Sequence, residues 1–349
     1  MPGVLEGRET LEVEESAKFW VLSSKLAVST PHFALRTSHY DTPMPSFPPG
    51  YLIGHAGDSQ RRTGCTVILP PAGTIAAVDV RGGAPGTRET GVFQPGNLVS
   101  EIHGLLFTGG SAFGLAAADG VSSWLRARGV GFAVGTARVP IVAAAVLFDL
   151  AVGDPEAYPD EAMGQSACEA AAEGEVAAGA VGAGTGATVG KLLGIAHSGR
   201  GGVGAAETRL PGGDRVCALA AVNAFGDVVD PATGRILAGA SRRGAFADTV
   251  HALEEEPLSE SPLAGASTTL VCVATTVAFD PSSLKRVAIE AQDGIARAVR
   301  PAHTVVDGDV AFALSPGGTP PPILTRLRVG AAAARVVAQA IASAVVPEP

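Results

Sequence analysis

Apolar residues in this chain gather in short runs that are separated by Gly- and Pro-rich turns. Runs of β-branched and small apolar residues that end at such turns are typical of strands. Most of these runs do not alternate with polar residues, which indicates strands covered on both faces. The pattern predicts buried strands at 66–69, 75–80, 139–150, 216–222, 268–276 and 310–314.

Four longer, Ala-rich segments have the spacing of helices, at 111–126, 160–173, 282–299 and 324–345. Ser111 is a candidate N-cap of the first helix, Gly129 lies past its end, and Pro301 stops the third. Strands that are covered on both faces by helices predict a layered α/β protein. The chain shows no internal repeats.

Residues 1–47 are irregular and become Pro- and Ser-rich at their end, so they are predicted to be a loosely held N-terminal extension. The remainder, 48–349, shows no clear boundary and is predicted to be a single domain. One sharp linker interrupts it, the acidic and then Pro- and Ser-rich segment 252–267. This linker leads directly into the apolar run that begins at Thr268.

Composition excludes several functional classes. Apolar residues make up 46% of the chain and the net charge is −9, which supports a sizeable core and argues against nucleic-acid binding. The N-terminus lacks the order of a signal peptide, and the longest apolar run, 139–148, is too short to span a bilayer. The cysteines are far apart and predict small core residues in a reducing, cytoplasmic compartment: Cys65, Cys168, Cys217 and Cys272.

The junction of linker and strand carries candidate chemistry. A peptide bond in a strained, exposed position there could be attacked by the Thr268 hydroxyl at the carbonyl of Ser267. Self-cleavage would make Thr268 a new N-terminus, whose α-amine, with an ordinary pKa near ~8, can act as general base for its own hydroxyl. The simpler interpretation is that Thr268 is a β-branched residue at the start of a strand.

Four other polar residues stand out against apolar surroundings. Lys191 is one of only four lysines, against 21 arginines, and is either a desolvated catalytic amine or a surface side chain. Asn223 follows an apolar run and is either an oxyanion donor or a turn residue. Asp307 and Asp309 either order an ammonium group or form an exposed turn, and the nearby His303 is a possible base. No Cys or second His lies at ligand spacing, so we expect no metal.

The Gly-rich segment 184–192 resembles a phosphate-binding loop only superficially. Its first glycine is displaced by one position, and Leu192 stands where a Mg²⁺-binding Ser or Thr is needed. The sequence therefore argues against ATP, and we expect no cofactor. Similarly, residues 110–114 miss the nucleophile elbow of serine hydrolases by one residue.

Taken together, these segments closely resemble the DmpA-type peptidases: L-aminopeptidase/D-esterases, β-peptidyl aminopeptidases and nylon-oligomer hydrolases. The resemblance runs from about residue 50 to the C-terminus and rests on residues 63–68, 78–87, 108–115, 182–191, 222–227 and 307–309. It implies an αββα four-layer sandwich of the DmpA and ornithine-acetyltransferase type, similar to N-terminal-nucleophile hydrolases. It also implies self-cleavage between Ser267 and Thr268 into two chains that stay together.

In the nylon-oligomer hydrolase branch the nucleophile is Thr, and its position matches Thr268. The other catalytic positions of that branch fall on Lys191, Asn223, Asp307 and Asp309. Lys191, held by the two aspartates, is expected to keep the Thr268 amine unprotonated, and Asn223 to donate to the oxyanion. The base for self-cleavage stays open between an Asp and water.

The resemblance further implies substrate contacts at Phe148, Gly110 and Ser111. Phe148 replaces a Tyr that in some relatives contacts the substrate or the oxyanion, and Ser267 replaces the Asn before the nucleophile. The expected activity is that of an aminopeptidase on short peptides or peptide-like amides. Two alternatives are an acyltransferase of ornithine-acetyltransferase type and an unprocessed, non-enzymatic scaffold. The resemblance implies a homo-oligomer, a tetramer of processed heterodimers.

Overall fold

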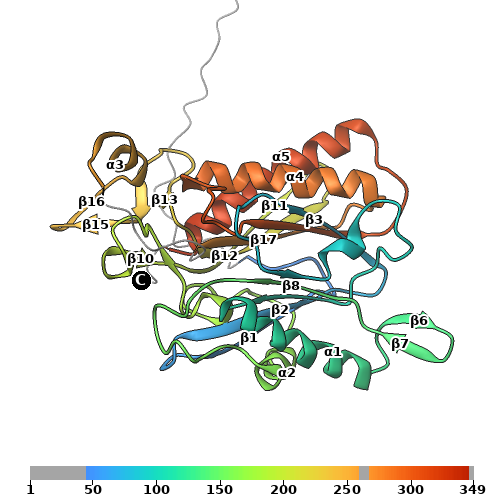
Figure 1. Cartoon of the computed structure of the whole chain (residues 1–349). Helices are drawn as coiled ribbons and strands as arrows, with labels where there is room; N and C mark the ends of the chain where they lie inside the picture. The colour runs from blue at the N-terminus through green and yellow to red at the C-terminus, as the bar shows by residue number, and fades with distance from the viewer. Residues whose placement is uncertain (1–44, 259–266, 346–349) are drawn as a thin grey trace, which may run out of the picture. The chain divides into compact units, whose positions relative to one another are not determined.

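A computed structural model describes residues 45–258 and 267–345 of the chain. Within it, two five-stranded sheets lie face to face (Figure 1). The upper sheet of Figure 1 has the order β11 (Gly202–Arg209), β12 (Arg215–Asn223), β17 (Thr268–Thr275), β19 (Val310–Pro316) and β3 (Thr74–Val80). The lower sheet has the order β1 (Leu52–Asp58), β2 (Thr63–Leu69), β5 (Gly104–Thr108), β8 (Val142–Val146) and β4 (Thr87–Arg88).

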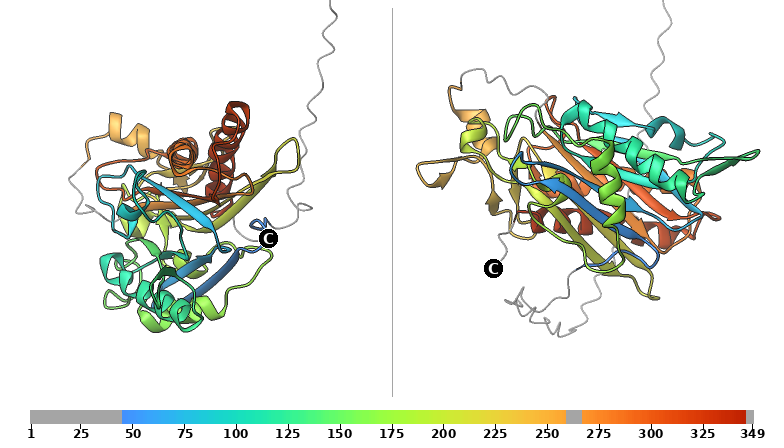
Figure 2. Two further views of the ribbon diagram at one scale, coloured as in Figure 1. Left: turned by 90° about the vertical axis from the view of Figure 1, so that its right-hand side faces the viewer. Right: turned by 90° about the horizontal axis from the view of Figure 1, so that it is seen from below.

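A pair of helices covers the outer face of each sheet, as the left view of Figure 2 shows from the side. Helices α4 (Pro281–Ala298) and α5 (Ile323–Ser343) pack on the upper sheet, and α1 (Ala117–Ala127) and α2 (Glu161–Glu169) pack on the lower one. The four layers confirm the predicted αββα sandwich.

Side chains of the central strands alternate between two apolar layers. On β12, Ala220 and Val222 pack toward α4 and α5, whereas Leu219 and Ala221 pack toward the lower sheet. Each buried strand must therefore be apolar at every position, which is why its sequence does not alternate. A third apolar layer lies between the lower sheet and its two helices.

The predicted strands at β2, β3, β12, β17 and β19 are confirmed. The predicted strand 139–150 is instead the end of β7 (Ala137–Val139) followed by β8, because Pro140 interrupts the ladder. The predicted helix at 111–126 begins as a 3₁₀ turn over Ser111–Ala116, and Ser111 does not cap it. Ser111 has φ of +53°, in the left-handed region, and lies inside the 3₁₀ turn, where its side chain makes no capping hydrogen bond.

Four strands of the two sheets were not predicted from the pattern: β1, β4, β5 and β11. Helix α2 ends at Glu169 instead of 173. The remaining elements are short: β6 (Phe132–Val134), β9 (Thr188–Val189), β10 (Gly199–Arg200), β13 (Asp227–Val229), β14 (Ile236–Ala238), β15 (Ser241–Arg242), β16 (Ala245–Phe246), α3 (Thr249–Glu255) and β18 (Val299–Arg300), with 3₁₀ turns at Thr90–Phe93, Gly182–Gly184 and Ile195–His197.

The predicted linker 252–267 differs from the structure at its start, since residues 252–255 belong to α3. The side chain of Asp248 accepts a hydrogen bond from the backbone of His251 and so caps this helix. Residues 259–266 of the linker and residues 1–44 of the predicted extension lie outside the described residues. The described residues, 45–258 and 267–345, belong to one compact unit.

Over the described ranges, no helix is both long and apolar enough to cross a membrane. All four cysteines are buried and free, as the predicted core role requires.

Candidate active site

Thr268 and Asn223 meet at one end of the upper sheet. Thr268 is the first residue of β17, and it is paired in register with Asn223, the last residue of β12. Alternation along the strands places both side chains on the face of Leu270 and Ala221, toward the lower sheet. Thr268 is only 4% exposed and Asn223 is fully buried.

The peptide bond between Ser267 and Thr268 is held from two sides. The Ser267 carbonyl oxygen accepts hydrogen bonds from the Gly308 backbone N–H at 2.8 Å and from the Thr268 hydroxyl at 2.5 Å. Ser267 is fully buried and forms a β-bridge with Asp307. The expectation of an exposed junction is therefore wrong. The peptide bond is enclosed because the loop that leads into β19, which contains Asp307 and Gly308, pairs with the backbone of Ser267.

Gly308 approaches the nucleophile candidate so closely that no side chain fits between them. A Cβ atom at Gly308 would lie 2.8 Å from Thr268 Oγ1 and 2.8 Å from the Ala84 carbonyl oxygen. A glycine at this position lets backbone pack directly against the hydroxyl.

The Asn223 side chain joins two loops. Its Oδ1 accepts a hydrogen bond from the Thr188 backbone N–H at 3.0 Å, and its Nδ2 donates to the Phe148 carbonyl oxygen at 2.9 Å. A buried amide with these partners is not a surface turn residue. The two loops fix its orientation beside Thr268.

Lys191 is fully buried, so the surface alternative is wrong. Its Nζ donates to the Asn223 carbonyl oxygen at 2.8 Å. Burial lowers the pKa of this ammonium to about 7, and the negative charges of Asp307 and Asp149 limit the fall. An amine with this pKa can exchange a proton near neutral pH.

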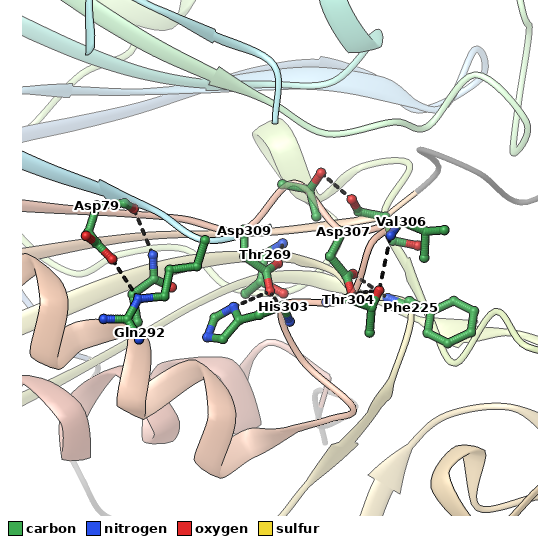
Figure 3. A network of polar contacts seen from close by, with 12 residues as sticks. Asp79, Phe225, Thr269, Gln292, His303, Thr304, Val306, Asp307 and Asp309 are labelled. Carbon is green, nitrogen blue, oxygen red and sulfur yellow. Dashed lines mark hydrogen bonds and ion pairs between the residues drawn. The ribbon is translucent and has the colours of Figure 1, made fainter. Parts of the chain in front are cut away.

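The two aspartates of the β19 loop are both 1% exposed, so the alternative of an exposed turn is also wrong. Asp307 accepts hydrogen bonds from the Thr304 hydroxyl at 2.5 Å and the Phe225 N–H at 3.2 Å (Figure 3). Burial and the neighbouring charge of Asp309 raise the pKa of Asp307 to about 6.

Asp309 has a different position from the one expected. Its Oδ1 accepts the Thr269 backbone N–H at 2.7 Å, and its Oδ2 lies 2.9 Å from His303 Nδ1 (Figure 3). Burial lowers the pKa of His303, but the hydrogen bond and charge of Asp309 outweigh this and raise it. Asp307 thus acts on Lys191 by charge, whereas Asp309 fixes the backbone next to Thr268 and holds the candidate base His303.

Asp149 is a further charged residue of the site, which the sequence analysis does not single out. This buried carboxylate accepts hydrogen bonds from the Thr63 hydroxyl at 2.8 Å and the Gly110 N–H at 2.7 Å, and burial raises its pKa. It is the second negative charge acting on Lys191. The one sequence signal for Asp149 is that this carboxylate directly follows the apolar run 139–148.

The three predicted substrate contacts lie around Asp149. Gly110 donates to its carboxylate, Ser111 donates to the Leu147 carbonyl oxygen at 2.8 Å, and Phe148 precedes it in the chain. Gly110 and Ser111 both have positive φ, +76° and +53°, which turns the chain sharply at the end of β5. Of the three residues, Phe148 contacts Asn223, because its carbonyl oxygen accepts a hydrogen bond from the Asn223 amide.

In the described part of the chain, no group of three or more His, Cys, Asp or Glu side chains could hold a metal ion. The site offers a hydroxyl, an amine of lowered pKa, a fixed amide and buried carboxylates. These groups are suited to acyl transfer by nucleophilic attack.

The sequence matches peptidase family S58 over residues 49–347. It is 44% identical over 303 residues to an uncharacterised aminopeptidase of Mycobacterium tuberculosis, covering 81% of this chain and 85% of that protein. It is 34% identical over 275 residues to the 6-aminohexanoate-oligomer endohydrolase of Paenarthrobacter ureafaciens, covering 76% of this chain and 73% of the enzyme.

Two solved structures have the same fold. One is a beta-aminopeptidase of Burkholderia sp., with a TM-score of 0.65, 23% identity and 87% of each chain covered. The other is the L-aminopeptidase D-Ala-esterase/amidase of Ochrobactrum anthropi, described as a variant of the Ntn-hydrolase fold, with a TM-score of 0.65, 19% identity and 87% of each chain covered.

Proposed function

The chain belongs to peptidase family S58, a family of aminopeptidase-like hydrolases, and from this premise we propose that it is a self-cleaving amide hydrolase with Thr268 as nucleophile. The observation that carries the proposal is the enclosed Ser267–Thr268 peptide bond. Its carbonyl oxygen is bound by the Gly308 N–H beside the Thr268 hydroxyl. A buried N–H donor at this oxygen would stabilise the negative charge that develops when the hydroxyl attacks.

Self-cleavage begins when Thr268 Oγ1 attacks the Ser267 carbonyl carbon. The C–N bond breaks, the Thr268 nitrogen leaves as an amine, and an ester joins Ser267 to the Thr268 oxygen. Water hydrolyses the ester and releases two chains. Since the α-amine is still an amide at this stage, another base must take the hydroxyl proton, and Lys191 with its pKa of about 7 is the group we assign to it.

After cleavage, the Thr268 amine takes over as general base. It accepts the hydroxyl proton during attack on a substrate amide and returns it to the leaving amine. Lys191 in its charged form lowers the pKa of this amine, and the Asn223 amide donates to the substrate oxyanion. Loss of a comparable donor costs about 3 kcal/mol of transition-state stabilisation.

The substrate class we propose is short peptides or peptide-like amides with a free amino end. The names of the relatives support it, as an aminopeptidase and an oligomer endohydrolase both cleave amide bonds. Phe148 contacts the site through its backbone carbonyl, which accepts a hydrogen bond from the Asn223 amide. The proposal includes a cytoplasmic location and a homo-oligomer of processed heterodimers.

The test is the denatured intact mass of purified protein beside Thr268→Ala. We expect two fragments that meet between Ser267 and Thr268, and one uncut chain in the variant. Hydrolysis of short aminoacyl amides should appear only in the cleaved protein. A single uncut mass in active wild-type protein would refute the proposal, and transfer of the acyl group to added ornithine in preference to water would favour the acyltransferase alternative.

A further inference from the structure

One cavity is lined by residues that include none of the candidate catalytic side chains. It is a cavity of about 280 Å³ between the β1–β2 turn, the loop 180–187 and β10. Its walls include two cationic side chains, hydroxyl groups and exposed glycine backbone: Ser59, Arg62, Gly184, Thr185, Arg200 and Gly201.

The two arginines of this cavity, Arg62 and Arg200, form no ion pair with a described carboxylate, whereas the adjacent Arg61 does. In the residues that the structure describes, neither the Arg62 nor the Arg200 side chain has a hydrogen bond or ion pair, and no carboxylate lines the cavity. Arg61, by contrast, binds Asp154 at 2.9 Å outside it. Two guanidinium groups and no carboxylate make the lining of this cavity positively charged in a chain of net charge −9.

The backbone holds Arg62 in a conformation that side chains rarely adopt. Its φ is +57°, in the left-handed region, which is unfavourable for a residue other than glycine. Its carbonyl oxygen lies so close to Gly186 that a Cβ there would approach to 2.1 Å. The chain therefore maintains a strained turn that places an arginine at the cavity.

We propose that this cavity binds a small anion through Arg62 and Arg200. The guanidinium fork pairs with the oxygens of a carboxylate or a phosphate group, and the volume accommodates a small organic acid or phosphate ester as well as inorganic phosphate. This binding site does not depend on the proposed function, and it is separate from the reacting groups.

The cavity is connected to the active site through one short ladder. Arg200 pairs in β10 with Thr188 of β9, and Thr188 donates its N–H to the Asn223 side chain. Gly201 donates its N–H to the Ala187 carbonyl oxygen at 2.9 Å. An anion that fixes Arg200 therefore also orders the loop that orients Asn223.

The experiment compares binding of inorganic phosphate and of succinate to the full chain, by isothermal titration in chloride buffer of constant ionic strength. Arg62→Gln and Arg200→Gln each remove one cation of the cavity. Arg61→Gln is the matched control, since it removes the same charge from the adjacent position. We expect at least tenfold weaker binding in both cavity variants and wild-type binding in the control.

The two ligands separate the sources of the anion, because tighter binding of phosphate or of succinate identifies a phosphate or a carboxylate ligand. Absence of binding to wild-type protein by either probe, or equal loss in all three variants, would overturn the proposal. Should Arg62→Gln fail to fold, Arg200→Gln tests it alone, since Arg200 is exposed and lies on a two-residue strand. Self-cleavage of the variants, read by mass, reports separately on the proposed function.

Discussion

Lys191→Met is expected to stabilise the uncut protein at neutral pH while abolishing its processing. The comparison is made in the Thr268→Ala chain, so that both proteins remain single chains. Lys191 is fully buried, and burial lowers its pKa from 10.5 to about 7. Methionine fills a similar volume without a charge, so the substitution removes the cost of burying the ammonium.

The sign of the pH dependence follows from the two pKa values. Between pH 7 and 10.5 the unfolded chain keeps a proton on Lys191 that the folded chain has lost, so the free energy of unfolding rises with pH. The rise is about 1.4 kcal/mol per pH unit, or on the order of 5 kcal/mol over the whole interval. Below pH 7 both states hold the proton and the full cost of the buried charge is present.

The Met variant lacks this dependence, but it loses interactions as well. The Asn223 carbonyl oxygen loses the hydrogen bond from Nζ, which costs about 1–3 kcal/mol, and Asp307 and Asp149 lose a neighbouring positive charge. Loss of the hydrogen bond and of the positive charge offsets part of the stability that Lys191→Met gains, at every pH at which Asp307 and Asp149 are ionised. We therefore expect the variant to be more stable by a few kcal/mol at pH 7, and the difference to shrink by about 3 kcal/mol at pH 9.

The assay is urea unfolding followed by circular dichroism at pH 6.5, 7, 8 and 9. Lys285→Met is the matched control, because it removes a partly exposed lysine that pairs with Asp79 at 2.9 Å. Parallel stability curves for the parent and Lys191→Met chains across this range would refute a lowered pKa for Lys191.

Three further predictions concern the reaction. Thr268→Ser should retain self-cleavage and hydrolysis, since serine supplies the same hydroxyl; a fully uncut serine variant by intact mass would contradict the nucleophile assignment. Asp149→Asn should shift the acid limb of the self-cleavage rate profile to lower pH, because Asp149 raises the pKa of Lys191; an unchanged profile would exclude this coupling. Gly308→Ala should slow self-cleavage at least tenfold, since its Cβ would lie 2.8 Å from Thr268 Oγ1, whereas Gly91→Ala, which meets open space, should cleave at the wild-type rate.

The sequence by itself determined the layered architecture and most of the candidate site. Non-alternating apolar runs require strands covered on both faces, and the helical segments supply that cover, so a layered α/β protein could be predicted from local pattern. The αββα order of the four layers came from the resemblance to a family. Asn223 and Lys191 could be singled out because asparagine and lysine are rare in this chain, and Thr268 because it begins an apolar run directly after the linker. Their roles came only from resemblance to a family.

The tertiary structure decided which of these groups meet and in what electrostatic environment. Asp309 binds the Thr269 backbone and His303, and the charges that raise the pKa of Lys191 are those of Asp307 and of Asp149, which is far from Lys191 in sequence. The pKa of about 7 for Lys191 depends on burial that no single segment encodes. Contacts between side chains from distant strands arise from the packing of whole layers. The enclosure of the Ser267–Thr268 bond and the cavity between Arg62 and Arg200 arise in the same way. Local propensity carries no information about either.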